Sequence, residues 1–207
     1  MTTLKPPCWI ETIEPEDATS DLSEVYQRVG SVHDKIHNLY RAFSLQPKPL
    51  ISADQHYRDI LHNEANHTEP WFLELLATQA AMIADCHYAL QNHGANFKNL
   101  LGDKKLGELM LDRVRKDDFN SSSVFTRKQA ALLSYGAKLC RNPEKMCFKD
   151  IETLRDVGVT DTEILEAVQS TACFAYWVRF INALGICLGD ESIGLYRDLN
   201  GSSNDAC

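Results

Sequence analysis

The chain has 207 residues, of which 44% are hydrophobic, so it can bury a core without disulfide bonds or a metal. The formal net charge is -8 and the acidic residues are spread along the chain, which argues against nucleic acid as a partner. No apolar run approaches the roughly 20 residues that cross a bilayer, and the N-terminus lacks the apolar segment of a secretory signal, so we expect a cytoplasmic protein without a membrane partner.

Hydrophobic residues recur with the helical period of about 3.6 residues, and no segment alternates as a strand would. The pattern predicts an all-α fold with a single domain over residues 19–196. Pro6, Pro7 and Pro15 indicate that residues 1–18 form an extended arm, lying over a neighbouring subunit or over the body of the domain. The polar residues 197–207 are expected to be a disordered tail.

Five helices are predicted in the first half of the chain. Caps and prolines place their boundaries, because Ser, Thr and Asp accept hydrogen bonds at helix starts and Pro is tolerated in a first turn. The predicted helices cover residues 20–32 with Ser20 as N-cap, a short stretch around 39–43, a longer stretch through Leu61 opened by Pro47 and Pro49, residues 69–83 with Thr68 as N-cap, and residues 86–101 with Asp85 as N-cap and Gly102 at the end.

Two capping boxes punctuate the second half, Thr126 with Gln129 and Thr160 with Glu163. In such a box each of the two side chains accepts from the backbone N–H of the other residue, which marks a helix start. The predicted elements are a short helix over residues 106–114, a loop over 117–123, a helix from Thr126 to about Cys140, a short helix over 149–157, and a long apolar helix from Thr160 through Gly185.

The segment from Glu74 to Gly94 places a carboxylate, a thiol and two imidazoles in two consecutive predicted helices. Cys86 and His93 are nearly two helical turns apart, so they lie on one stripe and are expected to face the same cavity. Glu74 reaches that stripe if its helix and the next form a hairpin. In a first helical turn, free amides and the helix dipole favour the thiolate of Cys86, although the charge of Asp85 opposes this shift.

Each of these residues also has a purely structural interpretation. A cysteine on an apolar helix usually packs in the core, and a histidine there can bond a backbone carbonyl. A carboxylate among apolar residues must face solvent or have a partner. His93 fits as that partner for Glu74 in a structural bridge as well as in a proton relay.

On these residues the sequence resembles the alkylhydroperoxidase D-like branch of the carboxymuconolactone decarboxylase superfamily, especially its peroxidase-related proteins. Their signature is a glutamate, a cysteine twelve residues later, a second cysteine three residues after that, and a histidine four residues further on; Glu74, Cys86 and His93 match. The likeness runs from about residue 38 to residue 185. It implies an alkylhydroperoxidase D-like helical bundle with catalysis by Glu74, Cys86 and His93, and site lining by His87, Tyr88, Ala89 and Arg179.

The second cysteine of this signature is replaced by Ala89. In the family the second thiol is understood to attack the peroxide, while the first, here Cys86, resolves the sulfenic acid as a disulfide. The resemblance therefore excludes the two-cysteine cycle for this chain. Two asparagines that are frequent in the closing helix are also replaced, by Ala175 and Val178, which alters the usual lining of the pocket.

The other residues of the motif carry weaker functional expectations. His87 and Tyr88 flank the thiol but point differently from it, so either can be a surface group, and packing is the favoured role for Tyr88. Arg179, inside an apolar helix, needs a carboxylate or a helix C-terminus, and a structural ion pair is favoured over substrate binding.

Neither a metal nor another cofactor is expected. Most of the histidines are scattered, and His33 with His37 lack an adjacent carboxylate or cysteine ligand. The seven cysteines have no regular disulfide or zinc spacing, so most should be reduced thiols. Those in apolar helical stretches are assigned to packing: Cys140, Cys173 and Cys187.

Three functions remain open. The first is a one-cysteine thiol oxidoreductase acting on a hydroperoxide, in which an external thiol reductant regenerates Cys86. The second is a cysteine-independent acid-base enzyme of the decarboxylase type, with His93 as base and Glu74 as its orienter, acting on a small organic acid or lactone. The third is a non-catalytic scaffold that keeps the fold. The resemblance also implies a homo-oligomer, a dimer or a trimer-based assembly.

Overall fold

The computed structural model describes residues 6–30, 35–120 and 124–194, and within these ranges it contains helices and no strand. The prediction of an all-α fold is therefore confirmed. Two 3-10 helices, Pro15–Asp17 and Pro143–Lys145, add single turns. The α-helices are α1 (Ser20–Gly30), α2 (Asn38–Arg41), α3 (Pro47–Leu61), α4 (Pro70–Ile83), α5 (His87–Leu101), α6 (Lys104–Arg115), α7 (Arg127–Arg141), α8 (Phe148–Asp156) and α9 (Asp161–Leu184).

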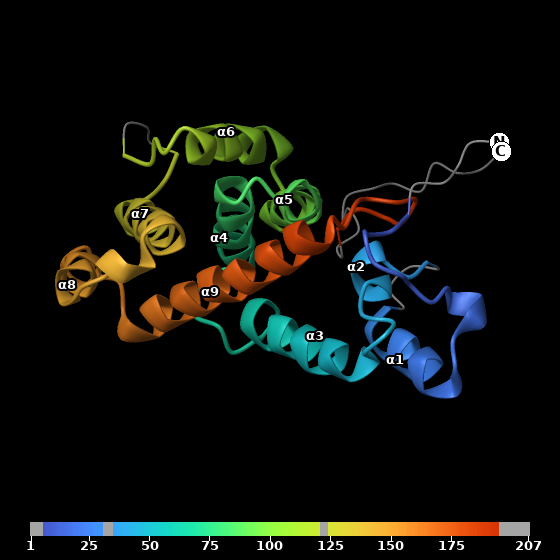
Figure 1. Cartoon of the computed structure of the whole chain (residues 1–207). Helices are drawn as coiled ribbons and strands as arrows, with labels where there is room; N and C mark the ends of the chain where they lie inside the picture. Colours follow the sequence, from blue (N-terminus) through green and yellow to red (C-terminus); the bar gives the residue numbers. More distant parts are fainter. Residues whose placement is uncertain (1–5, 31–34, 121–123, 195–207) are drawn as a thin grey trace.

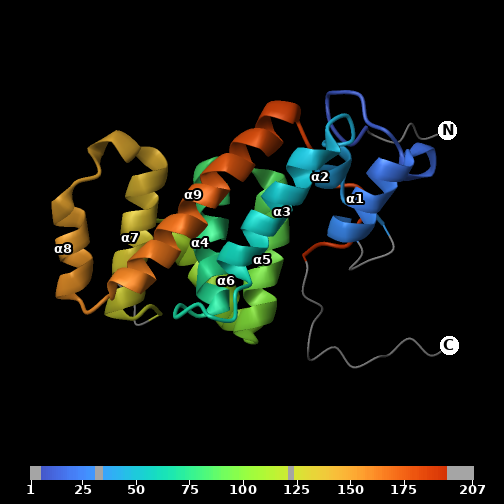
Figure 2. The same ribbon diagram turned by 90° about the horizontal axis from the view of Figure 1, so that it is seen from below.

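α4 is the central helix of the fold (Figure 1). It packs against α5, α7 and α9, and every residue from Phe72 to Ala81 is buried. A helix covered on all sides has no polar stripe, which explains why α4 is apolar around its circumference. α9 is the longest helix and contacts α3, α4 and α7, and its C-terminal end lies toward α2 (Figure 2).

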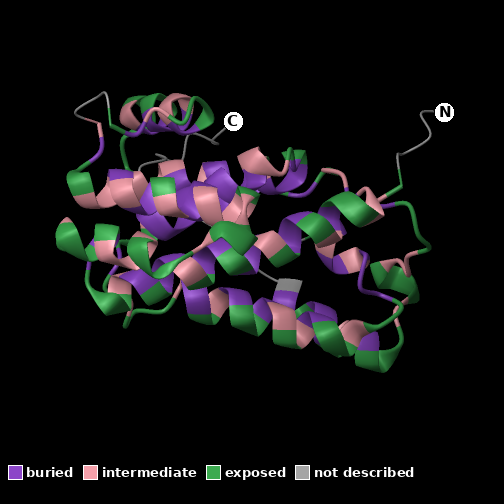
Figure 3. Ribbon diagram, turned by 60° about the vertical axis from the view of Figure 1, so that its left-hand side comes forward, coloured by how far each residue is buried: buried purple, intermediate pink, exposed green. Residues whose placement is uncertain are grey.

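The outer helices are amphipathic, and their buried faces point inward (Figure 3). In α1 the buried residues Leu22, Val25, Tyr26 and Val29 recur every three or four positions, which is one face of a helix. Among the described residues, no helix has the length and hydrophobicity that crossing a membrane requires.

Both predicted capping boxes are present. Thr126 Oγ1 accepts the Gln129 N–H over 3.2 Å, and Gln129 Oε1 accepts the Thr126 N–H over 2.9 Å. Thr160 and Glu163 repeat this exchange at 3.2 and 2.7 Å. Gly102 ends α5 in the left-handed conformation, with φ of 73°. These boundaries are therefore local in origin, because residues adjacent in the sequence satisfy the free backbone groups of the helix ends.

Two predicted N-caps in the first half are wrong. The side chain of Thr19, one residue before Ser20, accepts the N–H of Leu22 over 3.4 Å. Thr68 does not cap α4: its buried hydroxyl has no hydrogen-bond partner among the described residues, and Glu69 occupies the cap position.

A carboxylate from α9 takes over the role expected of Thr68. The backbone N–H groups of His67 and Thr68 each donate to Glu166 over 2.8 Å. This contact fixes the loop before α4 to the long helix, so the start of α4 is set by a residue about a hundred positions away. Such a partner gives no local sequence signal.

Residues 6–14 lie across the C-terminal end of α9. The Trp9 N–H donates to the Leu184 carbonyl over 2.8 Å, and the Cys187 N–H donates to the Pro7 carbonyl over 3.1 Å. The Trp9 ring covers Gly185, the C-cap of α9. The described part of the arm thus lies over the body of its own chain. The predicted tail at 197–207, loop residues 121–123 and helix residues 31–32 lie outside the described residues.

Candidate active site

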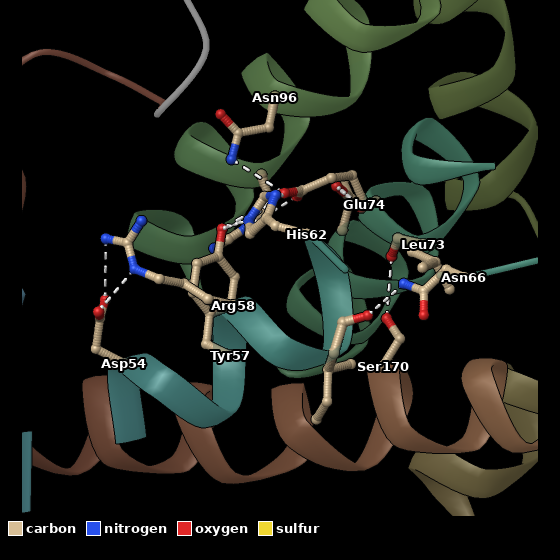
Figure 4. Close-up of polar contacts among 12 residues, drawn as sticks. Asp54, Tyr57, Arg58, His62, Asn66, Leu73, Glu74, Asn96 and Ser170 are labelled. Carbon is tan, nitrogen blue, oxygen red and sulfur yellow. Dashed lines mark hydrogen bonds and ion pairs between the residues drawn. The ribbon is translucent and has the colours of Figure 1, made fainter. Parts of the chain in front are cut away.

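Glu74 lies on α4 and is completely buried, with 0% of its surface exposed. Burying a carboxylate is costly unless donors surround it, and side chains of α3 and α5 do so here (Figure 4). His93 Nδ1 lies 2.8 Å from Oε2, while Asn96 Nδ2 and the Tyr57 hydroxyl lie 3.2 and 3.5 Å from Oε1. The packing of α3, α4 and α5 therefore creates a polar centre inside an apolar core.

His93 is held by aromatic rings as well as by this carboxylate. Its ring lies edge-on to Phe174 of α9, with centroids 4.4 Å apart, and edge-on to Tyr57 at 5.8 Å. A carboxylate can only accept a hydrogen bond, so Nδ1 carries the proton and Nε2 keeps its lone pair. The contact with Glu74 therefore fixes the tautomer in which Nε2 is the basic nitrogen.

A second imidazole lies on the far side of the carboxylate. His62, at the C-terminal end of α3, has Nε2 at 2.8 Å from the Tyr57 hydroxyl and 3.8 Å from Glu74 Oε1. Its side chain is 16% exposed, in contrast to the fully buried Glu74. Burial lowers the pKa of His62, and the nearby carboxylate opposes this only in part, so the ring is neutral at neutral pH.

A cavity of about 60 Å³ lies beside His93, where α2, α3, α5 and α9 meet. For comparison, an apolar cavity of about 150 Å³ binds benzene, and a water molecule needs roughly 10–15 Å³. The space therefore suits a few water molecules or a small organic molecule. Its polar lining is His37, Tyr40, Asp54, Tyr57, Tyr88, Asn92, His93 and Asn96, and its apolar lining is Leu39, Ala89, Phe174, Trp177, Ile181 and Gly194.

Three tyrosine hydroxyls in this wall stay protonated. Burial raises the pKa of Tyr57 and of Tyr88 well above the ordinary value, and neighbouring carboxylates add to the effect. Burial also raises the pKa of Tyr40, whose hydroxyl donates to Asp54 over 3.2 Å. Asp54 is paired in turn with Arg58 at 2.7 Å. The cavity therefore offers neutral hydroxyl groups to a ligand.

Known structures share this arrangement of helices. An uncharacterized peroxidase-related protein from Silicibacter sp. TM1040 superposes with a TM-score of 0.76 at 22% sequence identity, over 92% of this chain and 96% of that chain. A peroxidase-related protein from Ralstonia eutropha JMP134, described as an alkylhydroperoxidase AhpD core, superposes with a TM-score of 0.75 at 18% identity, over 90% and 94% of the two chains. The chain has the alkylhydroperoxidase fold.

The debrominase Bmp8, in complex with 2,3,4-tribromopyrrole, is a further neighbour with a TM-score of 0.70 at 11% identity, over 91% of this chain and 94% of that chain. Neither protein-family models nor curated proteins give a match to this sequence. At these identities the likeness is one of the alkylhydroperoxidase fold. The chemistry has to be argued from the residues of the site.

Cys86 departs from the expectation that it faces the cavity. It is 1% exposed and is not among the residues that line the cavity. Asp85 is left-handed, with φ of 49°, so Cys86 and not Asp85 is the N-cap of α5. Burial raises the pKa of the Cys86 thiol and Asp85 adds to this, while the backbone amide of Ala89 acts in the opposite direction. The predicted stabilisation of the thiolate is therefore wrong.

The remaining motif residues fall on both sides of α5 and on α9. Ala89 and Tyr88 line the cavity, whereas His87 is exposed. Arg179 is exposed on the outer face of α9 and donates to the Ala175 carbonyl. Of the seven candidates, Glu74, His93, Tyr88 and Ala89 belong to one region of the alkylhydroperoxidase fold; Cys86, His87 and Arg179 do not face the cavity.

Several residues of the site escaped sequence reasoning. Asn92 and Asn96 flank His93 on α5, and their spacing of one turn from each other was an available signal, since buried amides need partners. Tyr57, His62 and Phe174 lie on other helices. No local spacing links them to the motif.

Proposed function

We propose that the protein is a cysteine-independent acid-base enzyme, in which His93 exchanges a proton with a small molecule in the cavity and Glu74 orients His93. The 2.8 Å contact between His93 Nδ1 and Glu74 Oε2, with His93 itself in the cavity wall, carries this proposal. A base must lie within hydrogen-bonding reach of the proton that it removes, and His93 is the imidazole with a basic nitrogen left for this task.

The proton transfer follows from the hydrogen bonds of the resting site. His93 Nε2 removes a proton from the bound molecule and becomes an imidazolium ion, whose charge the adjacent Glu74 carboxylate stabilises. The same nitrogen returns the proton to another atom of the product. Tyrosine hydroxyls of the wall donate to the oxygen on which negative charge develops, which is the usual role of fixed donors in such reactions.

The size of the cavity supports a small organic molecule with an acidic C–H, N–H or O–H group as the substrate. The debrominase that shares the fold, solved in complex with a small halogenated ring, supports the same class. A one-cysteine thiol oxidoreductase is the competing function. It requires a reactive thiol in the cavity, whereas Cys86 lies outside it and burial raises its pKa.

The test compares acid-base and thiol chemistry in the same preparations. Small lactones and ketones in D₂O are followed by NMR, since reversible proton removal replaces hydrogen by deuterium. We expect deuterium incorporation that falls by about 100-fold or more in His93→Ala and is retained in Cys86→Ser. His56→Ala, a change at an exposed histidine of α3, is the control.

Thiol chemistry is scored in parallel by peroxide-dependent dimedone labelling of Cys86. Labelling at low peroxide excess, together with peroxide consumption that Cys86→Ser abolishes and His93→Ala only weakens, would overturn the acid-base proposal in favour of the oxidoreductase. Loss of neither activity in any variant would point to the non-catalytic scaffold.

A further inference from the structure

The hydroxyl of Tyr57 lies between two groups that can accept its single proton. His62 Nε2 is 2.8 Å away on one side and Glu74 Oε1 is 3.5 Å away on the other. A hydroxyl can donate to one acceptor while accepting from the other, so it can pass protons between them. The contact with Glu74 is longer than an ordinary O–H···O hydrogen bond, so it must shorten for transfer.

The position of Glu74 makes such a connection valuable. The proton on His93 Nδ1 points at a carboxylate with 0% exposure, so it cannot leave directly to solvent. His93 lies in the cavity wall, and a bound molecule covers that side of the ring. Asn96, the other donor to this carboxylate, carries an amide that does not exchange protons as an acid or base at neutral pH.

His62 has the properties of the outer end of a proton path. It does not line the cavity, its side chain is 16% exposed, and its ring can take up a proton on one nitrogen and release another from the second. Glu74 on α4 and His93 on α5 face it, and Arg58 and Asp54 are the charged groups near it on its own helix. Burial lowers its pKa, so it rests in the neutral form that accepts a proton.

We propose that Tyr57 and His62 form a proton path between the Glu74–His93 pair and solvent, which keeps the pair in exchange with water while the cavity is occupied. The path rests on the proposed function, because it serves a base at His93. In the outward direction His93 Nδ1–H passes to Glu74 Oε2, and the carboxylic acid turns to present its O–H from Oε1. Tyr57 accepts this proton and gives its own to His62 Nε2, and His62 releases a proton from Nδ1 to water.

The test measures the exchange of the His93 Nδ1 proton with solvent by NMR, in the full chain labelled with ¹⁵N-histidine and without substrate. His62→Gln keeps a hydrogen-bonding group but cannot carry a proton, and Tyr57→Phe keeps the ring but lacks the hydroxyl. We expect each change to slow the exchange by about tenfold or more. His56→Gln, on the exposed face of the same helix, should leave it unchanged.

Chemical rescue separates proton transfer from a purely structural role. In His62→Ala, added imidazole should restore the exchange in proportion to its concentration. In Tyr57→Phe it should not, because the inner step of the path is missing. Wild-type exchange rates in a folded His62→Gln protein, or a His62→Ala protein that imidazole does not rescue, would overturn the path.

This measurement is independent of turnover. Slowed exchange in the variants of a protein that shows no His93-dependent reaction would refute the proposed function and leave the path intact. His93-dependent turnover with unchanged exchange in the variants would refute the path alone.

Discussion

At Glu74 three donors converge on one carboxylate, so the acceptor cannot be removed without leaving each donor unsatisfied. His93, Asn96 and Tyr57 come from two helices, and the carboxylate holds them in register. Buried polar groups of this kind cost free energy when they lose a partner, and the loss exceeds the net gain of an ordinary hydrogen bond. The residue therefore matters for stability as well as for the proposed chemistry.

We expect Glu74→Ala to lower the free energy of unfolding by about 3 kcal/mol, since the buried donors lose their acceptor. Glu74→Gln should cost less, because its amide oxygen still accepts. Urea unfolding followed by circular dichroism measures both. Glu64→Ala, at an exposed glutamate, serves as the matched control, and an equal small effect at both positions would show that Glu74 is not structurally important.

The lowered pKa of His62 predicts a specific dependence of stability on pH. An unfolded imidazole binds its proton below about pH 6.5, whereas burial holds the pKa of His62 lower in the folded protein. The unfolded state therefore binds more protons in this interval. The stability linked to His62 is fully present above about pH 6.5 and is lost as the pH falls toward the folded pKa.

Melting temperatures between pH 7.5 and 5 measure this contribution. His62→Gln should lose less stability than the wild type over this range, because the substituted side chain does not titrate. His56→Gln should follow the wild type. Parallel curves for all three proteins would contradict the link between His62 and acid stability.

At the scale of single helices, the sequence was most informative where the partner is near in the chain. The boxes at Thr126 and Thr160 were predictable because both halves lie within one turn. Thr68 was predicted wrongly because its place is taken by Glu166, a distant residue of α9. Asp85 was predicted wrongly because the short link between α4 and α5 places it in a left-handed conformation.

Two left-handed glycines distinguish backbone strain from steric collision. An added Cβ at Gly102, which has φ of 73°, meets nothing within 4 Å, so Gly102→Ala should cost only the conformational penalty of about 1 kcal/mol. At Gly185, which has φ of 59°, an added Cβ would lie 2.1 Å from the Trp9 ring. Gly185→Ala should therefore cost more.

The Trp9→Ala background identifies the cause of that excess. There the added penalty of Gly185→Ala should shrink to the value for Gly102→Ala, as measured by thermal unfolding of the four proteins. An excess that persists without the Trp9 ring would mean that the arm is not its cause.

At the scale of the whole molecule, the cavity is a product of tertiary packing. Its wall combines Tyr40 of α2, Tyr57 of α3, His93 of α5 and Phe174 of α9, and no local pattern connects these residues. The sequence could identify Glu74 with His93 because a short hairpin joins their helices. It could not tell that Ala89 and not Cys86 faces the cavity, since a shift of the helix start changes which side chain is enclosed.

Self-association is a further expectation at this scale. Large hydrophobic side chains are exposed in the single chain, Trp9 at 77%, Phe148 at 67% and Leu165 at 56%. Burying such groups against a second copy is favourable. We expect light scattering after size-exclusion chromatography to give a multiple of 23.4 kDa at micromolar concentration. A mass of one chain at all concentrations would contradict the expectation of a homo-oligomer.

The methyl group that Ala89 presents to the cavity has a chemical consequence. Thiols in exposed sites are progressively converted to sulfinic and sulfonic acids by strong oxidants, and this damage is irreversible or needs a dedicated repair enzyme. A site whose working atoms are imidazole nitrogen and carboxylate oxygen has no sulfur to lose. Its chemistry would therefore persist under an oxidant load that silences enzymes dependent on a cavity thiol.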